Sequence, residues 1–293
     1  MENSFFAPTE VFVGRDVGGR SAAVRSSDVE HFEAGTGDDN RWPGVTAGGE
    51  ATIAPALLFH SEVYRDLSWY LPNLIGNLHA KQEWDLFQPF RIGDTVHTRS
   101  TIVDRYRKRN RDYIVNEVLI TDGDGRWLQR SRTHQSFLSD DPADVVVDKD
   151  RERRLERRFE IGGGAGERLG PLSKAVSLAM CEAFSGPGKN YHTDQEMARA
   201  LGFPDVVVQG MLSICFLSEL MTKRFGMGWF CGGKLNVSLV NVLWGNERVL
   251  AHGQVRERHS EGRRTRVIVD VWCEKDDGTK TIVGTASALP AKD

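Results

Sequence analysis

The sequence predicts an α+β protein built from two copies of one unit, each with a long central helix wrapped by an antiparallel sheet. Three observations lead to this prediction: a weak internal repeat, matched glycine spacing in the two halves, and an apolar segment followed by strand-like segments in each half. At 293 residues the chain is long enough for two domains of about 100–150 residues each.

Two apolar segments mark equivalent points of the repeat. One, "IAPALLFHSEVYRDL", begins at Ile53, and the other, "VVQGMLSICFLSELM", begins at Val207. A glycine turn, a β-rich run and a polar turn follow each of them in the same order, so we interpret the halves as two copies of one fold. The matching intervals are 56 residues from Gly37 to Gly93 against 59 from Gly186 to Gly245, and 32 from Gly93 to Gly125 against 33 from Gly245 to Gly278.

Each apolar segment predicts a helix, over 53–67 in the first half and over 207–222 in the second. The second segment is apolar almost all round, and a helix with no polar face belongs inside a fold. The segments that follow, "YIVNEVLI" and "RVIVDVW", alternate like strands with one buried face. A buried helix wrapped by an antiparallel sheet, occurring twice in tandem, is a double hotdog, and this is the predicted fold class.

The segment between the copies, "SDDPADVVVDKDRERRLERRFEIGGGAGERLG", is dense in charge and then rich in glycine, as is typical of a linker. It is not a nucleotide-binding loop, because it contains neither GxGxxG nor a GK[ST] ending. We expect an N-terminal unit at 1–140, a linker at 141–168 and a C-terminal unit at 169–293 that carries the active site.

The composition argues against several classes of protein. A formal net charge of −3 gives no field that attracts nucleic acid, and no apolar run reaches the roughly 18 residues of a membrane span. The N-terminal residues lack a basic segment followed by an apolar one, so we expect a cytoplasmic protein. The four cysteines lie far apart without the spacing of a zinc site, which predicts reduced core thiols and no metal: Cys181, Cys215, Cys231 and Cys273.

The stretch "SGPGKNYHTDQEMARALGFPDVVVQGMLS", residues 185–213, resembles the hydratase motif of MaoC-like dehydratases and R-specific enoyl-CoA hydratases. The N-terminal half resembles the FAS1-like dehydratase domain of double-hotdog members in "GTGDDN", "APALLFH" and "NLHAKQEWDLFQPFRIGDTV". The resemblance implies a hydro-lyase that reversibly hydrates 2-enoyl-CoA to 3-hydroxyacyl-CoA. It also implies a small-molecule acyl-CoA substrate, no cofactor, no contact with nucleic acid or membrane, and an assembly that could be a homodimer.

The motif is incomplete in both halves. His192 stands at the position of the family's catalytic His, but Pro187 and Lys189 stand where the family has Asp and Asn. The N-terminal copy departs from the motif in the other way. It keeps the acidic residue, Asp38, and the amide residue, Asn40, but has Pro43 at the histidine position.

The chemistry favours the C-terminal half as the catalytic one. A neutral imidazole takes or gives a proton near pH 7, which suits His192 to acid–base work. Gly210 begins the second apolar helix, where a backbone N–H and the helix dipole stabilise an enolate-like thioester oxygen, and its lack of a side chain allows close approach. Its counterpart is Ala56 after Pro55, and Pro55 has no N–H to donate. We predict His192 and Gly210 as the catalytic residues.

Five neighbours of this pair are predicted to contact substrate. They are Lys189, Asn190, Tyr191, Gln209 and Met211. Structural roles are the alternative for several nearby residues. Thr193 and Glu196 fit a helix capping box, and Asp194 fits helix initiation. His60 and His79 fit structural or pocket-lining roles.

Two other functions fit the same fold. A thioesterase would hydrolyse the thioester instead of hydrating the enoyl group. A non-catalytic hotdog would bind acyl-CoA or serve as a partner subunit.

Overall fold

The computed structural model describes residues 11–38, 53–65, 78–108, 111–138, 158–186 and 188–290. All described strands form one ten-stranded sheet in which every named pair is antiparallel. Five of the strands and two helices lie in the N-terminal half: β1 (Asp16–Ala23), α1 (Ser26–Thr36), α2 (Glu62–Arg65), β2 (Leu78–Leu86), β3 (Thr95–Lys108), β4 (Arg111–Thr121) and β5 (Trp127–Leu138).

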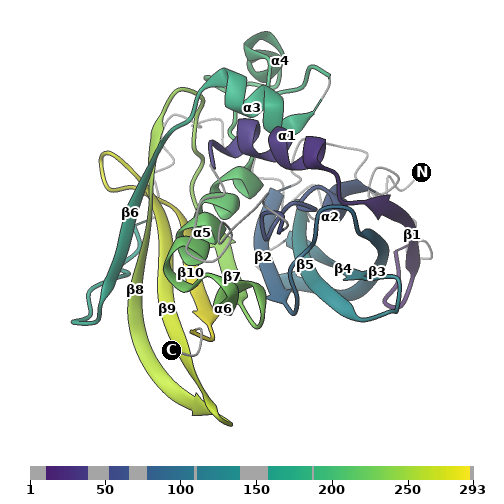
Figure 1. Cartoon of the computed structure of the whole chain (residues 1–293). Helices are drawn as coiled ribbons and strands as arrows, with labels where there is room; N and C mark the ends of the chain where they lie inside the picture. The colour runs from purple at the N-terminus through teal and green to yellow at the C-terminus, as the bar shows by residue number, and fades with distance from the viewer. Residues whose placement is uncertain are drawn as a thin grey trace.

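The C-terminal half contributes five strands and four helices. In chain order they are β6 (Arg168–Ala175), α3 (Leu178–Ser185), α4 (Gln195–Ala200), α5 (Gly210–Phe225), α6 (Met227–Phe230), β7 (Lys234–Leu239), β8 (Arg248–Glu261), β9 (Arg264–Lys275) and β10 (Lys280–Ala288). Figure 1 shows α5 lying against the strands of this half, with α1, α3 and α4 gathered at one end of the molecule.

The strand order repeats between the halves. The sheet runs β1-β3-β4-β5-β2-β7-β10-β9-β8-β6, so each half has its first strand at the outer edge and its second strand at the centre. The halves join where β2 pairs with β7, from Lys81 opposite Ser238 to Asp85 opposite Lys234. The internal repeat inferred from the sequence is therefore present in the topology.

Two isolated bridges fix the register of the repeat. Ile53 pairs with Arg91 in the first half, and Val207 pairs with Trp244 in the second. In each half the bridge residue is the first residue of the apolar segment, which places Ala56 at the position equivalent to Gly210, as the sequence predicts. The turn before β8 differs in one detail, because its left-handed residue is Asn246 (φ 63°), not the preceding glycine.

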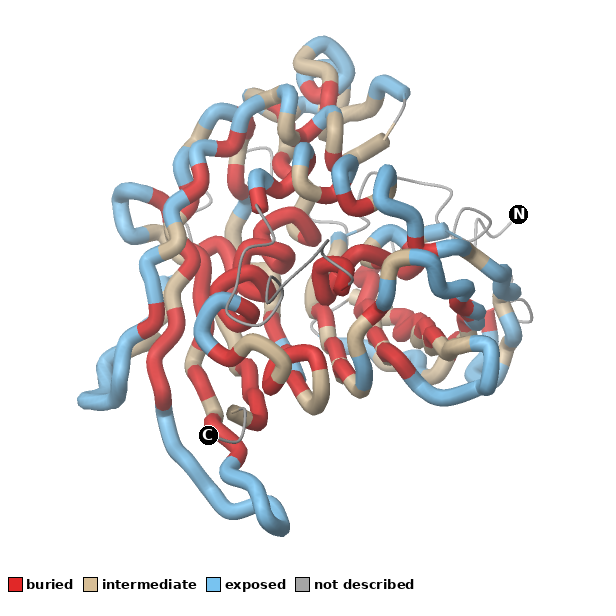
Figure 2. The backbone as a smooth tube through the Cα atoms, in the orientation of Figure 1, coloured by how far each residue is buried: buried red, intermediate tan, exposed pale blue. Residues whose placement is uncertain are grey.

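The core is continuous across the two halves. One large cluster of buried side chains includes Leu57 and Trp84 of the first half and Phe216 and Trp229 of the second. Figure 2 shows buried backbone along α5 and the inner strands, whereas the far end of the β8–β9 hairpin is exposed. The tight packing of α5 confirms that the apolar helix predicted over 207–222 lies inside the fold.

The first half departs from the prediction of a long helix over 53–67. Of that stretch, residues 56–61 form turns and only Glu62–Arg65 is α-helical, while 66–67 lie outside the described residues. Sheet side chains take backbone carbonyls that a helix would use itself: Gln129 donates to Ala56 O at 2.9 Å and Asn116 donates to Val63 O at 3.3 Å. Tertiary hydrogen bonds have replaced the helical ones.

Candidate active site at the start of helix α5

His192 lies in the turns between α3 and α4 and is held by two hydrogen bonds, one from its ring and one from its backbone. Its Nδ1 lies 2.6 Å from the carbonyl oxygen of Val207, and its backbone N–H donates to Asn190 Oδ1 at 2.8 Å. A carbonyl oxygen only accepts, so Nδ1 carries the ring proton of the neutral imidazole. The lone pair is therefore on Nε2.

The surroundings keep this histidine neutral. Burial lowers the pKa of His192 to about 4, and the hydrogen bond to Val207 opposes that shift only in part. The Tyr191 ring covers one side, with ring centroids 3.9 Å apart and an interplanar angle of 40°. At pH 7 the imidazole is a proton acceptor.

The N-terminus of α5 lies close by in the chain and in space. Val207 receives the His192 bond, and three residues later the helix begins at Gly210. Among the described residues, no partner bonds the backbone N–H groups of Gly210 and Met211, so both are available donors at the positive end of the helix dipole. The His192 ring therefore bonds the segment that leads into α5, three residues before these N–H groups.

The space above Gly210 is filled by protein. A Cβ added there would lie 1.9 Å from Leu239 Cδ2, at the end of β7. The glycine thus leaves room for the Leu239 side chain in this packing, whereas the sequence analysis attributed it to the approach of a thioester. Leu239 is a flexible side chain, so the two explanations are separable by mutation.

The five predicted substrate contacts have different surroundings. Gln209 donates to Ser185 Oγ at 2.6 Å, which ties the start of α5 to the end of α3. Asn190 shapes the His192 turn, and Met211 is completely buried. Lys189 is 81% exposed and pairs with Asp194 at 2.8 Å, on the surface. Of the five, Tyr191 packs its ring on the imidazole of His192, and the Asn190 side chain bonds the His192 backbone.

Asp194 has the structural role expected of it. Its side chain accepts from Met197 N at 3.0 Å and caps α4. The capping box predicted from Thr193 and Glu196 is wrong, because Thr193 instead accepts from Asn190 N at 3.0 Å within the preceding turn. The cap is one residue later than the pattern indicated.

The first half supplies no second complete site among the described residues. Asp38 is buried, its N–H donates to Thr36 Oγ1 at 3.2 Å, and its charge is near enough to Cys215 to raise the pKa of that thiol further, although burial is the main cause. Asn40, Pro43 and the motif position Pro187 lie outside the described residues.

Sequence reasoning missed the contribution of the first half to this region. His60 stacks on Phe184 of α3, with centroids 4.1 Å apart and rings 8° from parallel. His79 bonds within its own half, where its Nδ1 lies 2.8 Å from the hydroxyl of Tyr64 in α2. The sequence signal was the pair of histidines, which gave no indication that His60 faces the other half.

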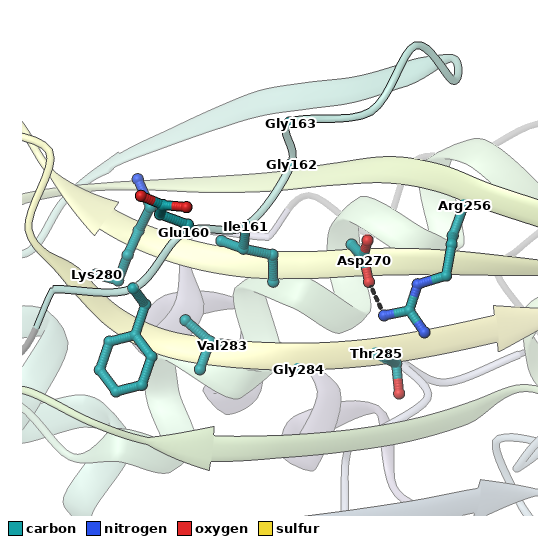
Figure 3. A pocket seen from close by; sticks show the side chains of 11 residues that line it. Glu160, Ile161, Gly162, Gly163, Arg256, Asp270, Lys280, Val283, Gly284 and Thr285 are labelled. Carbon is teal, nitrogen blue, oxygen red and sulfur yellow. Dashed lines mark hydrogen bonds and ion pairs between the residues drawn. The ribbon is translucent and has the colours of Figure 1, made fainter.

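A groove lies elsewhere on the protein. It has a volume of about 790 Å³ and runs between segment 159–163 and the outer face of β8, β9 and β10. Figure 3 shows the Arg256–Asp270 ion pair at one end and Lys280 with Glu160 at the other. None of the predicted site residues lines it, and two of its charged groups are already paired, Arg256 with Asp270 and Lys280 with Glu274.

The described residues contain no group of three or more His, Cys, Asp or Glu side chains that could hold a metal ion. All four cysteines are free, and three of them, Cys181, Cys215 and Cys273, are buried. Burial raises the pKa of Cys181 to about 11, which removes nucleophilic character. Of the helices that are described, none has the length and apolar character to cross a membrane.

The chain has the fold of the MaoC-like dehydratases. A MaoC-like dehydratase from Phytophthora capsici superposes with a TM-score of 0.72 at 16% identity, over 97% of this chain and 98% of that one. A second MaoC-like dehydratase gives a TM-score of 0.71 at 17% identity, over 96% and 98%. A Mycobacterium tuberculosis protein with a double hotdog fold gives 0.62 at 13% identity, over 96% and 97%.

No family model matches the sequence, and no curated protein matches it. The structural likeness nevertheless confirms the resemblance inferred from the 185–213 motif. At these identities the likeness establishes the fold, and the chemistry has to be argued from the site.

Proposed function

We propose that this protein is a hydratase/dehydratase of acyl thioesters, which adds water to a 2-enoyl thioester and catalyses the reverse elimination. One observation carries the proposal: His192, neutral and with its Nδ1 proton fixed by Val207, adjoins the free N–H groups that begin α5. A positioned base and oxyanion donors are the two groups that α-proton chemistry next to a thioester requires.

We also propose that the fold is a double hotdog, with an N-terminal unit at 1–140, a linker at 141–168 and a C-terminal unit at 169–293. The repeated strand order and the equivalent bridges at Ile53 and Val207 support this division. The described part of the linker lies along the outer face of the second half, where Gln254 donates to the carbonyls of Gly164 and Gly166.

In the elimination direction, His192 Nε2 takes the α-proton of the 3-hydroxyacyl thioester. The electron pair moves toward the thioester oxygen, which accepts hydrogen bonds from the Gly210 and Met211 N–H groups. As the Cα–C3 double bond forms, the C3–O bond breaks, and the proton on Nε2 passes to the departing hydroxide to give water. Hydration is the same sequence reversed, and neither direction needs a cofactor.

A non-catalytic acyl-CoA-binding role is the second candidate, and a specific observation favours it. The side chain of Leu239 occupies the space directly over Gly210, where a thioester would approach. Catalysis therefore requires Leu239 to rotate away when substrate binds.

Crotonyl-CoA distinguishes these functions. Loss of the absorbance of the conjugated thioester, with no thiol released, is the result expected of a hydratase. Thiol release without hydration would identify a thioesterase instead. Binding of the CoA thioester with neither signal would identify the non-catalytic alternative. Comparing CoA with carrier-protein thioesters then tests the CoA preference that the family resemblance implies.

A further inference from the structure

The side chain of Tyr191 packs directly on the proposed base. Its ring centroid lies 3.9 Å from that of His192, and the two rings are inclined at 40°. Phe203 also packs on the phenol ring, with centroids 5.9 Å apart, and Trp244 lies 6.3 Å beyond Phe203. The phenol is therefore held in a row of aromatic rings that begins at the imidazole.

Val207 supports Tyr191 and His192 together. Its N–H donates to the carbonyl oxygen of Tyr191 at 3.2 Å, and its carbonyl oxygen accepts from His192 Nδ1 at 2.6 Å. Val207 is itself paired with Trp244 in the isolated bridge before α5. The same backbone contacts therefore set the position of both residues.

Each of the two rings has a polar atom that no described group uses. Among the described residues, neither the Tyr191 hydroxyl nor His192 Nε2 has a hydrogen-bond partner. Burial raises the pKa of Tyr191, so the phenol keeps its proton at pH 7. The pair thus presents one O–H donor and one nitrogen lone pair in side chains that touch.

The other polar groups beside this pair are committed elsewhere. Lys189 is 81% exposed and pairs with Asp194, whose carboxylate also caps α4. The amide of Gln209 donates to the end of α3 at 2.6 Å. Pro187, which stands where the family has Asp, has no side-chain proton to donate. Of the five predicted substrate contacts, Tyr191 alone carries an O–H group.

We propose that Tyr191 is a further catalytic residue, whose hydroxyl donates a hydrogen bond to the oxygen at C3 of the acyl chain. This inference rests on the proposed hydratase function. As the C3–O bond breaks, that oxygen takes the bonding electron pair and gains negative charge, which the Tyr191 O–H stabilises. The proton that completes the water still comes from His192 Nε2, so the phenol ends the cycle unchanged. In hydration the same hydrogen bond holds the oxygen of the attacking water.

Tyr191→Phe keeps the ring against His192 and removes only the hydroxyl. We expect kcat for dehydration of 3-hydroxybutyryl-CoA, supplied as each enantiomer, to fall about 10- to 150-fold, the loss typical of one hydrogen bond to a charged group. KM should change little, because the charge on the C3 oxygen develops in the transition state. The urea midpoint should stay at the parent value, since no described group bonds the hydroxyl.

3-Chlorobutyryl-CoA separates a catalytic hydroxyl from a structural one. Chloride is a weak base that leaves without a hydrogen-bond donor, whereas removal of the α-proton still requires His192. The Tyr191→Phe variant should therefore eliminate chloride at the parent rate, once the uncatalysed rate is subtracted. His192→Ala should lower elimination from both substrates. A phenol that only held the imidazole in place would affect both reactions equally.

Tyr106→Phe is the matched control. Its hydroxyl also lies beside a histidine, 3.0 Å from His134 Nδ1, but on β3 of the first half. That variant should keep the parent rate with both substrates.

A Tyr191→Phe variant that dehydrates 3-hydroxybutyryl-CoA at the parent rate, or that loses both eliminations equally, would overturn the inference and leave the proposed function standing. A parent protein that eliminates neither water nor chloride would remove the proposed function, and the catalytic role of Tyr191 with it.

Discussion

The side chain of Leu239 packs directly over Gly210, so that a methyl group added at Gly210 would lie 1.9 Å from Leu239 Cδ2. Gly210→Ala should therefore destabilise the fold by about 1–3 kcal/mol through overpacking. Leu239→Ala in the same chain should restore the stability, as measured by urea unfolding. If activity also returns in the double variant, the glycine serves packing alone; if only stability returns, the thioester itself needs the space.

His192→Ala should lower crotonyl-CoA hydration about 10²–10⁴-fold, the range for loss of a positioned general base. The lost bond to Val207 should cost only about 0.5–1.5 kcal/mol of stability. His252→Ala is a matched control in the same half, because that ring also stacks on an aromatic neighbour, Trp272, with centroids 5.0 Å apart. A His192 variant that turns over at the parent rate would place the chemistry elsewhere.

Asp38→Asn tests whether the first half has its own acid–base group. The second half carries the histidine and the helix N-terminus, so we expect hydration within severalfold of the parent. A folded Asp38 variant without activity, beside an active His192 variant, would show that the reaction belongs to the first half. Circular dichroism confirms folding in each case.

An ion triad around the buried Glu219 is tied to the first half through Lys174. Lys174 and Lys223 each lie 2.7 Å from Glu219, whose side chain is 3% exposed, and Lys174 also donates to Gly37 O at 2.7 Å. Lys174→Met should cost about 3–5 kcal/mol, because it removes the more buried partner of that carboxylate. Lys174→Met/Glu219→Leu should recover most of the loss in urea unfolding, and a double variant as unstable as the single would contradict this account.

Stability should fall as the pH drops from about 6.5 to 5. Burial lowers the pKa of His60 to about 3 and the pKa values of His79 and His192 to about 4. Below the unfolded value of 6.5 the unfolded chain binds these protons and the native chain does not, so acid favours unfolding. Two to three extra protons give a slope on the order of 3 kcal/mol per pH unit near pH 6.

Urea unfolding at pH 7, 6.5, 6 and 5.5 measures that slope above the range in which carboxylates titrate. His79→Phe/Tyr64→Phe, which removes one of the three histidines with its partner, should reduce it by about a third. A free energy of unfolding that is constant over this interval would show that the three rings are accessible to protons in the native state.

The sequence by itself determined the features that depend on local pattern. The duplication, the buried helix α5 and the pairing of His192 with the start of that helix all follow from periodicity, glycine placement and motif spacing. Such patterns depend on residues within one element or on neighbouring elements along the chain, and the features that they predict are present in the structure.

Only the tertiary structure determined the side-chain contacts between different elements. Residues 56–61 form turns in place of the predicted helix, with Gln129 bonded to Ala56 O, Leu239 lies over Gly210, and His60 stacks on Phe184 of the other half. Each of these contacts joins segments that are far apart in the sequence. A pattern that is read along one chain contains no distance between them, so only the folded arrangement sets which polar group meets which.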